Sequence, residues 1–286
     1  MLNDLSRRKS ASNPCTSRVI FNNITTNFIM ELNKIYNEDC LSGLKKIEEN
    51  SVDLILTSPP YNIGIDYDTY DDNRPWDEYY AWCADWLKEC FRVLKHDGRI
   101  VINHYISLGT AKFHTSPISH LNIICENIGF KLHCIPIWYD DNPQLAKLSA
   151  FGSYLSARAP YISNPYEGFL IMYKDDWRKD DAHSMENDIS KEDFLSITRG
   201  KLNFEVEKKP LTKCCFSEDL AMKLIKILTF KNDIVLDPYM GSGTTAVAAM
   251  RCDRRFIGFE LSPNYHKIAE ERLETERLLM SQMELF

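Results

Sequence analysis

The sequence predicts an α/β protein built on a mostly parallel sheet that carries helices on both faces. Short apolar runs alternate with segments of helical periodicity along the chain. Two of these runs stop abruptly at turns rich in proline or glycine, as strands do at the ligand-binding edge of such sheets. The length of 286 residues suits one large domain, and 44% hydrophobic and 26% charged residues are ordinary for a globular protein.

Each element follows from its pattern. The predicted strands are apolar runs bounded by polar turns, and in chain order they cover 35–36, 52–56, 99–103, 130–138, 168–173, 234–237 and 256–260. The predicted helices repeat apolar residues every three or four positions, and they cover 41–49, 77–95, 118–128, 217–228, 244–251 and a long segment from Pro263. Gly98 and Gly129 are predicted C-caps, and Ser217 is a predicted N-cap.

The remaining segments lack this periodicity. Residues 1–29 are rich in Ser, Asn, Thr and Arg, and we expect a flexible N-terminal extension before a folded domain at 30–286. Residues 62–75 are predicted to form a loop over the first strand-end turn. Segments 139–167 and 174–213 are predicted to be irregular insertions on the sheet.

Charge and cysteine content exclude some classes. The net charge of −7 does not fit a chain that binds nucleic acid over its whole surface. The 9 cysteines include no Cys-x-x-Cys pair, so neither a disulfide framework nor a metal site is expected, and a reducing cytoplasm fits best. No apolar run approaches the roughly 20 residues of a membrane span, and no signal peptide is recognisable.

The first strand-end turn follows the apolar run 52–56. Two prolines stop the strand, because neither has an N–H and each restricts the residue before it. The turn presents the hydroxyl of Ser58, the carbonyls of Pro59 and Pro60 and the ring of Tyr61, which suit a flat ring that bears an amine. An ordinary Pro-Pro turn with a surface tyrosine is the alternative interpretation.

The second strand-end turn is Asp-Pro-Tyr-Met-Gly-Ser-Gly-Thr-Thr at 237–245. Gly241 and Gly243 permit a tight turn and close approach of the backbone to a ligand. The lysine of a phosphate-binding P-loop is absent, and position 246 lacks the third glycine of a dinucleotide site. Asp237 favours a cationic ligand, and Glu260 at the end of the next strand can accept ribose hydroxyls. S-adenosylmethionine meets these requirements, whereas an ordinary strand–helix turn is the alternative.

The Thr-Ser-Pro-Pro-Tyr and Asp-Pro-Tyr-Met-Gly-Ser-Gly motifs together resemble those of amino-methyltransferases that act on DNA. The resemblance runs from about residue 34 to 273, in the circularly permuted order that places Pro-Pro-Tyr first. It implies a Rossmann-like methyltransferase fold with one antiparallel strand and S-adenosyl-L-methionine as cofactor. The cofactor-binding residues that it implies are Asp39, Cys40, Thr57, Phe216, Ser217, Asp237, Pro238, Tyr239, Gly241, Ser242, Gly243, Thr244 and Glu260. Thr212-Lys213 replaces a common His-Pro pair, which weakens the expected contacts there.

The resemblance also implies a reaction. Ser58 and the Pro59 carbonyl would accept hydrogen bonds from the exocyclic amine of a base flipped out of double-stranded DNA, while Tyr61 stacks on it beside Pro60. No metal is required. Serine at position 58 favours N4 of cytosine, and N6 of adenine is the alternative. The only Pro-Cys pair, at 14–15, lies in the extension, which argues against methylation at carbon 5.

Partners follow from the same resemblance. The insertions at 139–167 and 174–213 are expected to recognise the DNA sequence. Candidate cationic contacts there are Arg158, Arg178, Lys179, Arg199 and Lys201, although for each one taken singly an ordinary surface charge is the favoured interpretation. A cognate restriction endonuclease is expected as a partner, and the protein as a monomer or homodimer. His104 is interpreted as a satisfied residue and not as a general base.

Two rival functions remain open on the sequence. An RNA or protein methyltransferase could use the same Pro-Pro-Tyr turn for another planar amine or amide. A catalytically silent relative that only binds DNA or senses the cofactor is the second rival, and the two intact motifs disfavour it.

Overall fold

The computed structural model describes residues 30–110, 113–138, 152–160, 162, 166–180, 188–202 and 216–283. The predicted flexible extension, 1–29, therefore lies outside the described residues, as does much of each predicted insertion. No helix within these ranges has the length and hydropathy that crossing a membrane requires.

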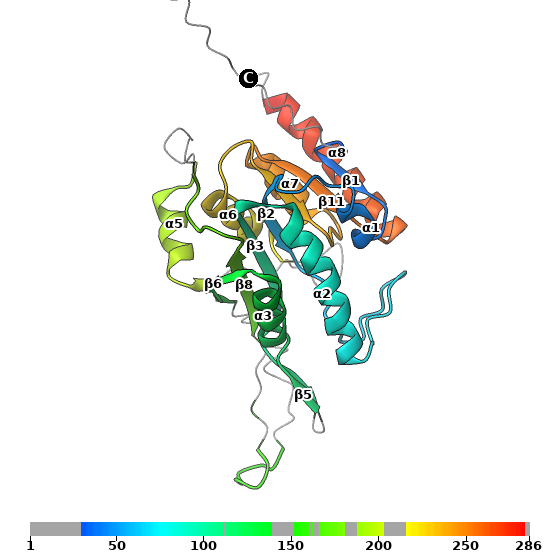
Figure 1. Cartoon of the computed structure of the whole chain (residues 1–286), viewed down its shortest axis with the longest axis vertical. Coiled ribbons are helices and arrows are strands. Elements are labelled where there is room, and N and C mark those ends of the chain that lie inside the picture. The colour runs from blue at the N-terminus through cyan, green and yellow to red at the C-terminus, as the bar shows by residue number, and fades with distance from the viewer. Residues whose placement is uncertain are drawn as a thin grey trace, which may run out of the picture.

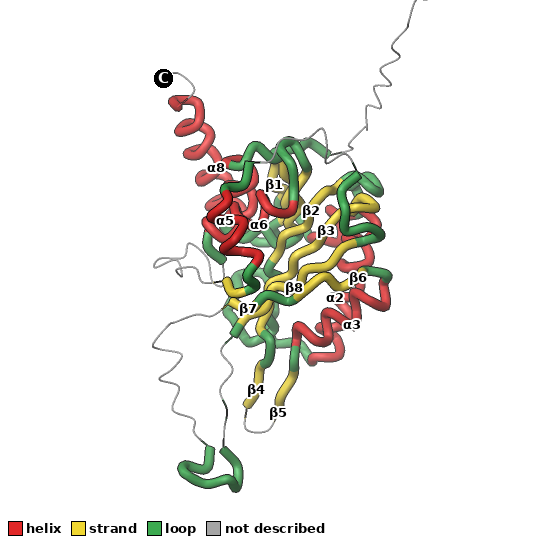
Figure 2. Tube along the Cα trace, turned by 90° about the vertical axis from the view of Figure 1, so that its left-hand side faces the viewer, coloured by secondary structure: helices red, strands yellow, loops and turns green. Residues whose placement is uncertain are grey.

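The main sheet has the strand order β1-β11-β10-β2-β3-β8-β7-β9, and β6 also pairs with β8 (Figure 2). Its strands are β1 Lys34–Tyr36, β2 Val52–Thr57, β3 Leu94–Tyr105, β6 Lys131–Cys134, β7 Ile137–Trp138, β8 Glu167–Tyr173, β9 Lys201–Leu202, β10 Ile234–Asp237 and β11 Arg255–Phe259. Neighbours from β1 to β3 pair in parallel, whereas β8 runs antiparallel to β3, β6 and β7. The expected mostly parallel sheet with one antiparallel strand is confirmed for the described strands.

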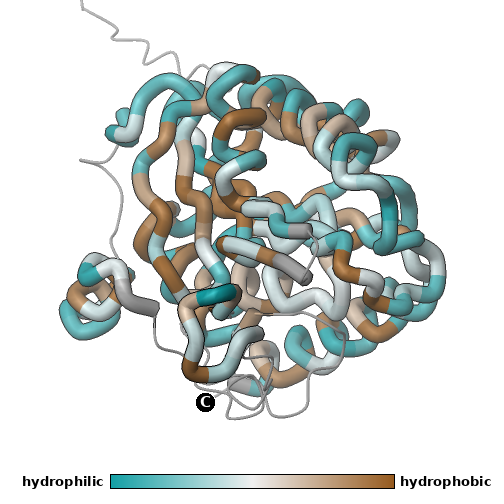
Figure 3. The backbone as a smooth tube through the Cα atoms, turned by 90° about the horizontal axis from the view of Figure 1, so that it is seen from below, coloured by the Kyte–Doolittle hydropathy of each residue, from teal (hydrophilic) through white to brown (hydrophobic). Residues whose placement is uncertain are grey.

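Helices cover both faces of this sheet (Figure 1). The described helices are α1 Cys40–Leu44, α2 Trp76–Val93, α3 Pro117–Ile128, α5 Lys191–Thr198, α6 Glu218–Leu228, α7 Thr244–Arg251 and α8 Pro263–Met283. One core packs α1, α2 and α3 against the sheet, and the other packs α5 to α8 against the opposite face. Figure 3 shows the hydrophobic segments running through the interior.

Alternation along the middle of β3 illustrates why the central part of each buried strand is a continuous apolar run. Ile100 and Ile102 face the first core, while Val101 between them faces the second. Because successive side chains point to opposite faces and both faces are covered, apolar residues follow one another here without alternation.

The boundary between α2 and β3 differs from the prediction. Gly98 was expected to cap the helix, but α2 ends at Val93 and Leu94 is already extended. Leu94 pairs with Val52 of β2 and is fully buried, so sheet pairing takes over where helical periodicity ends. Gly98 lies inside β3, where a Cβ would come within 2.8 Å of the Leu94 side chain. The predicted cap at Gly129 is confirmed, with φ of 126°.

Three further segments differ from the predicted elements. The strand expected at 130–138 is divided into β6 and β7 around Pro136, which cannot donate a ladder hydrogen bond. Two short strands that were not predicted, β4 Leu108–Thr110 and β5 Phe113–Thr115, pair antiparallel with each other. The segment 174–213 contains α5 and β9, and Ser190 caps α5 by accepting from the Asp193 N–H at 3.0 Å.

Lys179 is not a DNA contact in this arrangement. Its ammonium lies 3.1 Å from Asp53 and 3.0 Å from Asp233, and its side chain is only 7% exposed. Asp53 is the second residue of β2 and Asp233 precedes β10, so Lys179 lies at the amino edge of the sheet, opposite the two predicted motifs. Sequence pattern alone could not distinguish this buried lysine from a surface one.

Candidate active site

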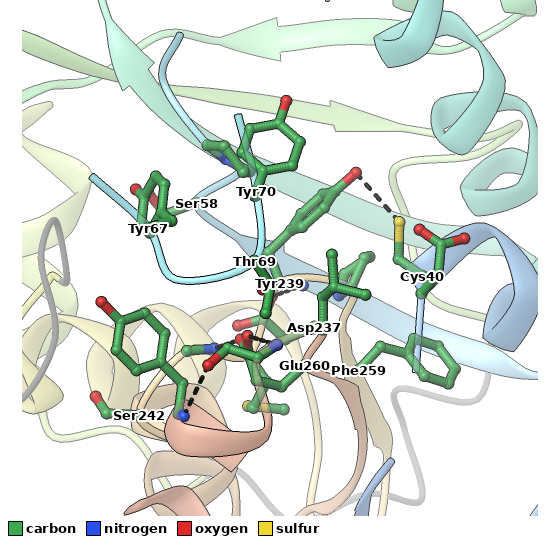
Figure 4. Close-up of a pocket in the computed structure, with 18 of the residues that line it drawn as sticks. Cys40, Ser58, Tyr67, Thr69, Tyr70, Asp237, Tyr239, Ser242, Phe259 and Glu260 are labelled. Carbon is green, nitrogen blue, oxygen red and sulfur yellow. Dashed lines mark hydrogen bonds between the residues drawn. The ribbon is translucent and has the colours of Figure 1, made fainter. Parts of the chain in front are cut away.

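A cavity of about 240 Å³ lies at the carboxyl edge of the sheet, where β1, β2, β10 and β11 end (Figure 4). Most of its described lining comes from the turns after these four strands and from residues 67–71 and 74 of the loop 62–75. We call this loop, 62–75, the roof loop. Trp82, Phe216 and Tyr265 complete the described lining. Ser58 and Pro60 of the first motif and Gly241 of the second line this same cavity. Parallel strand order explains the meeting, because β2 and β10 are neighbours and end at the same edge.

Asp237 ties the two motifs together. One carboxylate oxygen accepts from the Thr57 hydroxyl at 2.7 Å and from the Tyr239 N–H at 3.0 Å. The other accepts from the Thr245 hydroxyl at 2.6 Å. Burial raises the pKa of Asp237 to about 6, although these hydrogen bonds favour the ionised form. Asp237 therefore organises the end of β10 from within the protein, and Thr57 contacts it instead of the cavity.

The glycine turn between β10 and α7 needs two positive φ angles. Gly241 has φ of 54° and Gly243 has φ of 84°, conformations that residues with a Cβ rarely adopt. A Cβ on Gly243 would also come within 3.2 Å of the Ala269 Cβ on α8. The turn thus brings backbone to the cavity while α8 packs closely behind it. Arg272 of α8 donates to the Ser242 carbonyl at 3.0 Å and holds the turn from that side.

Glu260 lies opposite this turn, just after β11. Its carboxylate accepts from the Gly241 N–H at 2.8 Å and from the Ser262 N–H at 2.8 Å. Burial, reinforced by the charges of Asp237 and Asp68, raises the pKa of Glu260 to about 7. The group is therefore close to half ionised at neutral pH, and a ligand that donates to its carboxylate would favour the charged form.

The described lining as a whole is acidic and aromatic. Its carboxyl groups are Glu38, Asp39, Asp68, Asp71, Asp237 and Glu260. Arg74 is the one cationic side chain among the described lining residues, and its guanidinium lies over the ring of Tyr70, 4.6 Å from the centroid. Such a lining favours a ligand with positive charge and disfavours phosphate. Flat faces for a ring come from Trp82, Phe216, Tyr239 and Phe259.

The segment before and within α1 forms another wall. Asp39 caps α1 by accepting from the Ser42 N–H at 3.2 Å, which fixes Cys40 at the helix start. The Cys40 thiol donates to the Tyr239 hydroxyl at 3.3 Å, as Figure 4 shows. Burial raises the pKa of Cys40 to about 12, so the thiol stays protonated and is a poor nucleophile.

The roof loop is fixed by its own acids and by the sheet edge. The buried Asp72 accepts from the N–H groups of Asn62, Ile63 and Ile65 at 2.7, 3.1 and 3.0 Å. At the far side of the cavity, Asp68 accepts from the Ser262 hydroxyl at 2.6 Å and from the Asn264 amide at 2.8 Å. The loop therefore crosses between the two strand ends, with Asp68 as its contact on the β11 side.

The two proline carbonyls of the first motif are not equivalent. The Pro60 carbonyl accepts from the Tyr79 hydroxyl of α2 at 2.7 Å. Tyr79 also lies 3.1 Å from Nε2 of His104. The backbone after Ser58 is thereby anchored to α2, and the orientation of the turn is set by a buried hydroxyl.

Tyr61 and His104 are both buried. The Tyr61 side chain is 2% exposed, and its ring stacks on His104 with centroids 4.5 Å apart. A base could stack on Tyr61 only after the surrounding groups have moved, so the stacking role stays a prediction. Burial lowers the pKa of His104 to about 3, and its Nδ1 accepts from the Tyr105 N–H at 2.8 Å. A neutral, internally bonded His104 agrees with its interpretation as a satisfied residue.

Most of the predicted site residues are brought together. Those that line the cavity are Asp39, Cys40, Ser58, Pro60, Phe216, Asp237, Pro238, Tyr239, Gly241, Ser242, Thr244 and Glu260. Those placed behind the described lining are Thr57, Pro59, Tyr61, Ser217 and Gly243. Ser217 caps α6 by accepting from the Leu220 N–H at 3.3 Å. Thr212 and Lys213 lie outside the described residues.

The sequence reasoning missed Trp82, Phe259 and the roof-loop residues of the lining, and also two residues behind it. Asn103 and Glu167 share the proton of the Tyr61 hydroxyl as acceptors, at 2.8 and 2.9 Å. Asn103 lies at the carboxyl end of an apolar strand, and that position could have drawn attention to it. Glu167 begins β8, and it reaches this edge only because β8 is antiparallel, a direction that local pattern does not encode.

The fold and the site define a Rossmann-like methyltransferase, in which the glycine turn and the Pro-Pro-Tyr turn end neighbouring strands. The family model for DNA methylase, covering N6 and N4 enzymes, matches residues 52–271. The chain belongs to this DNA methylase family.

Individual proteins support this placement. The Type II methyltransferase M.MjaVI of Methanocaldococcus jannaschii is 39% identical over 176 residues, which is 61% of this chain and 87% of that protein. Type II methyltransferase M.BglII of Bacillus subtilis is 31% identical over 271 residues, 89% of this chain and 73% of that protein. A protein of Thermus thermophilus, described as a DNA modification methylase and solved with S-adenosyl-L-methionine, is 28% identical with a TM-score of 0.67, covering 85% and 93% of the two chains.

Proposed function

We propose that this protein is a site-specific methyltransferase that transfers the methyl group of S-adenosyl-L-methionine to the N4 amine of cytosine in double-stranded DNA. The observation that carries the proposal is the shared cavity. Ser58, which can accept from an amine, and Glu260, which can accept from ribose hydroxyls, line it together. A methyl donor and a target amine can therefore lie next to each other at one edge of the sheet.

S-adenosyl-L-methionine is the cofactor of this family, and the described residues fit it. When bound, it supplies a methyl group on a positively charged sulfonium. The acidic lining offers acceptors for its hydroxyls and ammonium group, and Glu260 is the one best placed after β11. Tyr239 and Trp82 offer aromatic surfaces for adenine, and the glycine turn permits close backbone approach. Asp39 and Cys40 form the wall on the α1 side.

The first motif would prepare the target amine. The lone pair of an exocyclic amine is delocalised into the ring, so the amine is a poor nucleophile. Hydrogen bonds from its two N–H groups to the Ser58 hydroxyl and the Pro59 carbonyl would favour a tetrahedral nitrogen. The Pro60 carbonyl already accepts from Tyr79. Pro59 remains the proposed second acceptor, and because it lies behind the described lining, DNA binding would have to bring its carbonyl toward the cavity. Positioning of this kind supplies much of the rate in a direct transfer.

The target base must leave the duplex to reach Ser58. Stacking of such a base on Tyr61 would contribute about 1–3 kcal/mol. Because Tyr61 is 2% exposed here, DNA binding would have to uncover its ring, which packs against the rings of His104 and Tyr105. The segments 139–167 and 174–213 are proposed to read the DNA sequence, with the exception of the buried Lys179.

The reaction needs no buried general base. The pKa of His104 is lowered to about 3, so it could accept a proton only weakly, and Tyr79 and Tyr105 occupy its nitrogens. The transferred methyl leaves a cationic amine that loses a proton readily. That proton can leave through the Ser58 hydroxyl, which lines the cavity.

The choice of base rests on Ser58. Serine at this position of the motif favours cytosine N4, and N6 of adenine is the second candidate. DNA adenine methyltransferase YhdJ of Escherichia coli K12 is 28% identical over 274 residues, which keeps the adenine candidate in view. Relatives described as Type II methyltransferases also support a partner restriction endonuclease that cuts the same sequence.

The test is methyl transfer to DNA from cells that lack methylation. Purified protein and labelled cofactor are incubated with this DNA, which is digested to nucleosides and analysed by mass spectrometry. We expect N4-methylcytosine, and methylome sequencing of the same DNA gives the recognition sequence. N6-methyladenine alone would replace cytosine by adenine in the proposal. Label in RNA or protein and none in DNA would overturn it.

A further inference from the structure

The Ser58 hydroxyl belongs to a chain of hydrogen bonds that leads away from the cavity. Ser58 donates to the Tyr61 hydroxyl at 3.0 Å. Tyr61 in turn lies 2.8 Å from Oδ1 of Asn103 and 2.9 Å from Oε2 of Glu167. The chain links the end of β2 to the end of β3 and the beginning of β8.

The direction of this chain follows from the groups at its far end. The Oδ1 atom of Asn103 is an amide oxygen and can only accept, so the Tyr61 hydroxyl donates toward this end of the chain, where a carboxylate oxygen of Glu167 is the second acceptor. The Asn103 amide nitrogen donates to the Gly168 carbonyl at 3.4 Å, which leaves its oxygen toward Tyr61. The Tyr61 hydroxyl has one proton, and Asn103 and Glu167 are both acceptors for it. Its oxygen must therefore accept from Ser58.

This direction decides what Ser58 offers to a substrate. A serine hydroxyl can donate or accept, and a hydroxyl that donated to the ring nitrogen of a base would not activate its amine. With its proton directed to Tyr61, Ser58 presents lone pairs to the cavity that it lines. An amine, which donates, then finds an acceptor already oriented.

We propose that Tyr61 is a positioning residue whose hydroxyl, oriented by Asn103 and Glu167, holds Ser58 as a hydrogen-bond acceptor for the target amine. The inference rests on the proposed function and concerns the same site. It gives Tyr61 a role that depends on the hydroxyl group and not on the aromatic face alone.

A double-mutant cycle tests the inference. Tyr61→Phe keeps the buried ring and removes the hydroxyl, and we expect kcat to fall about tenfold, the rate equivalent of one lost hydrogen bond. KM for DNA and cofactor affinity should stay within about twofold of the wild type, since neither depends on the Ser58 proton. In a Ser58→Ala background, Tyr61→Phe should have no further effect on kcat, because it acts only through Ser58.

The terminal acceptors give a second arm. Glu167→Gln should lower kcat less than Tyr61→Phe, because Asn103 still accepts from Tyr61, and this effect should also vanish in the Ser58→Ala background. Tyr173→Phe, at the other end of β8, and Glu126→Gln, exposed on α3, are matched controls that should leave kcat unchanged. Thermal melting of each variant separates loss of folding from loss of rate.

The outcomes are distinguishable. Full activity of Tyr61→Phe, or effects of the two substitutions that simply multiply, would overturn the inference while the proposed function stands. A Tyr61→Phe variant that raises KM for DNA and leaves kcat intact would likewise overturn it, because the hydroxyl would then act in DNA binding and not through Ser58. A wild-type protein that methylates no DNA would overturn both.

Discussion

The neighbouring strands β10 and β2 end in turns of opposite chemistry, and each turn serves a different ligand of the site. After β10 the chain turns through two glycines with positive φ, so that backbone N–H groups and buried carboxylates border the cavity. After β2 it turns through two prolines, which supply no N–H and leave carbonyls and a hydroxyl as acceptors. The first turn suits a cofactor with positive charge, and the second suits an amine that must donate. The residue types of the two turns thus let one edge of the sheet bind two chemically different ligands.

Ser58→Ala should impair the proline turn alone, and we expect it to have the largest effect of the substitutions considered. We expect kcat for methyl transfer to fall about a hundredfold, in the range seen when a group that stabilises a transition state is removed. The cofactor dissociation constant should not change, because Ser58 belongs to the proline turn. Tritium transfer and calorimetry measure the two quantities. A variant that lost cofactor affinity instead would show that the two turns are not functionally separate.

Glu260 tests the glycine turn, because the affinity for the cofactor should depend on the protonation of this carboxyl group and therefore on pH. Its pKa is raised to about 7 in the folded protein, chiefly by burial, and cofactor hydroxyls should favour the ionised form. Cofactor affinity should therefore rise about tenfold between pH 6 and pH 8, as the group loses its proton. Without cofactor, the stability of the folded protein should change with pH in the opposite direction to cofactor affinity. The folded protein holds the proton more tightly than the unfolded chain, whose ordinary value is 4.5, so stability falls as pH rises from about 4.5 to 7.

The control for this profile is Glu260→Gln, in which the step near pH 7 should disappear and affinity at pH 8 should fall. Glu271→Gln, a 68% exposed carboxylate on α8, should keep the wild-type profile. Should the step near pH 7 persist without Glu260, Asp237, with its pKa raised to about 6, would be the group to examine next.

The two turns also differ in how far sequence could predict them. The glycines, the prolines and the acids at the ends of β10 and β11 are local signals, and they identified the two turns that meet at the cavity. What joins the turns is not local. The Thr57–Asp237 contact depends on β2 lying next to β10, and the Tyr61–Glu167 contact depends on the antiparallel direction of β8. Pairing of Leu94 with Val52 of β2 also explains why Leu94 begins β3 and does not extend α2.

Thr57→Val should affect both sides at once. The substitution keeps the volume and removes the hydroxyl that donates to Asp237 at 2.7 Å. Loss of this fully buried hydrogen bond should lower the free energy of unfolding by about 1–3 kcal/mol. It should also reduce kcat and cofactor affinity together by about fivefold, because the hydrogen bond sets the spacing of the two turns. Denaturant unfolding and calorimetry measure these effects. A change in stability with normal kcat and affinity would limit Thr57 to a structural role.

Asp68→Ala should have the smallest effect, because Asp68 belongs to the roof loop and not to either of the two turns. The exposed Asp68 carboxylate accepts from Ser262 at 2.6 Å and from Asn264 at 2.8 Å, which connects the roof loop to the end of β11. The Ser262 and Asn264 hydrogen bonds lower the pKa of Asp68, so the contact persists across the neutral range. Exposed hydrogen bonds contribute little, and we expect cofactor dissociation to accelerate only about threefold in stopped-flow measurements. Asp85→Ala, on the exposed face of α2, should leave the rate unchanged. An unaltered rate in Asp68→Ala would mean that cofactor leaves without opening the β11 side, and that the roof is held by Asp72 and its three N–H partners alone.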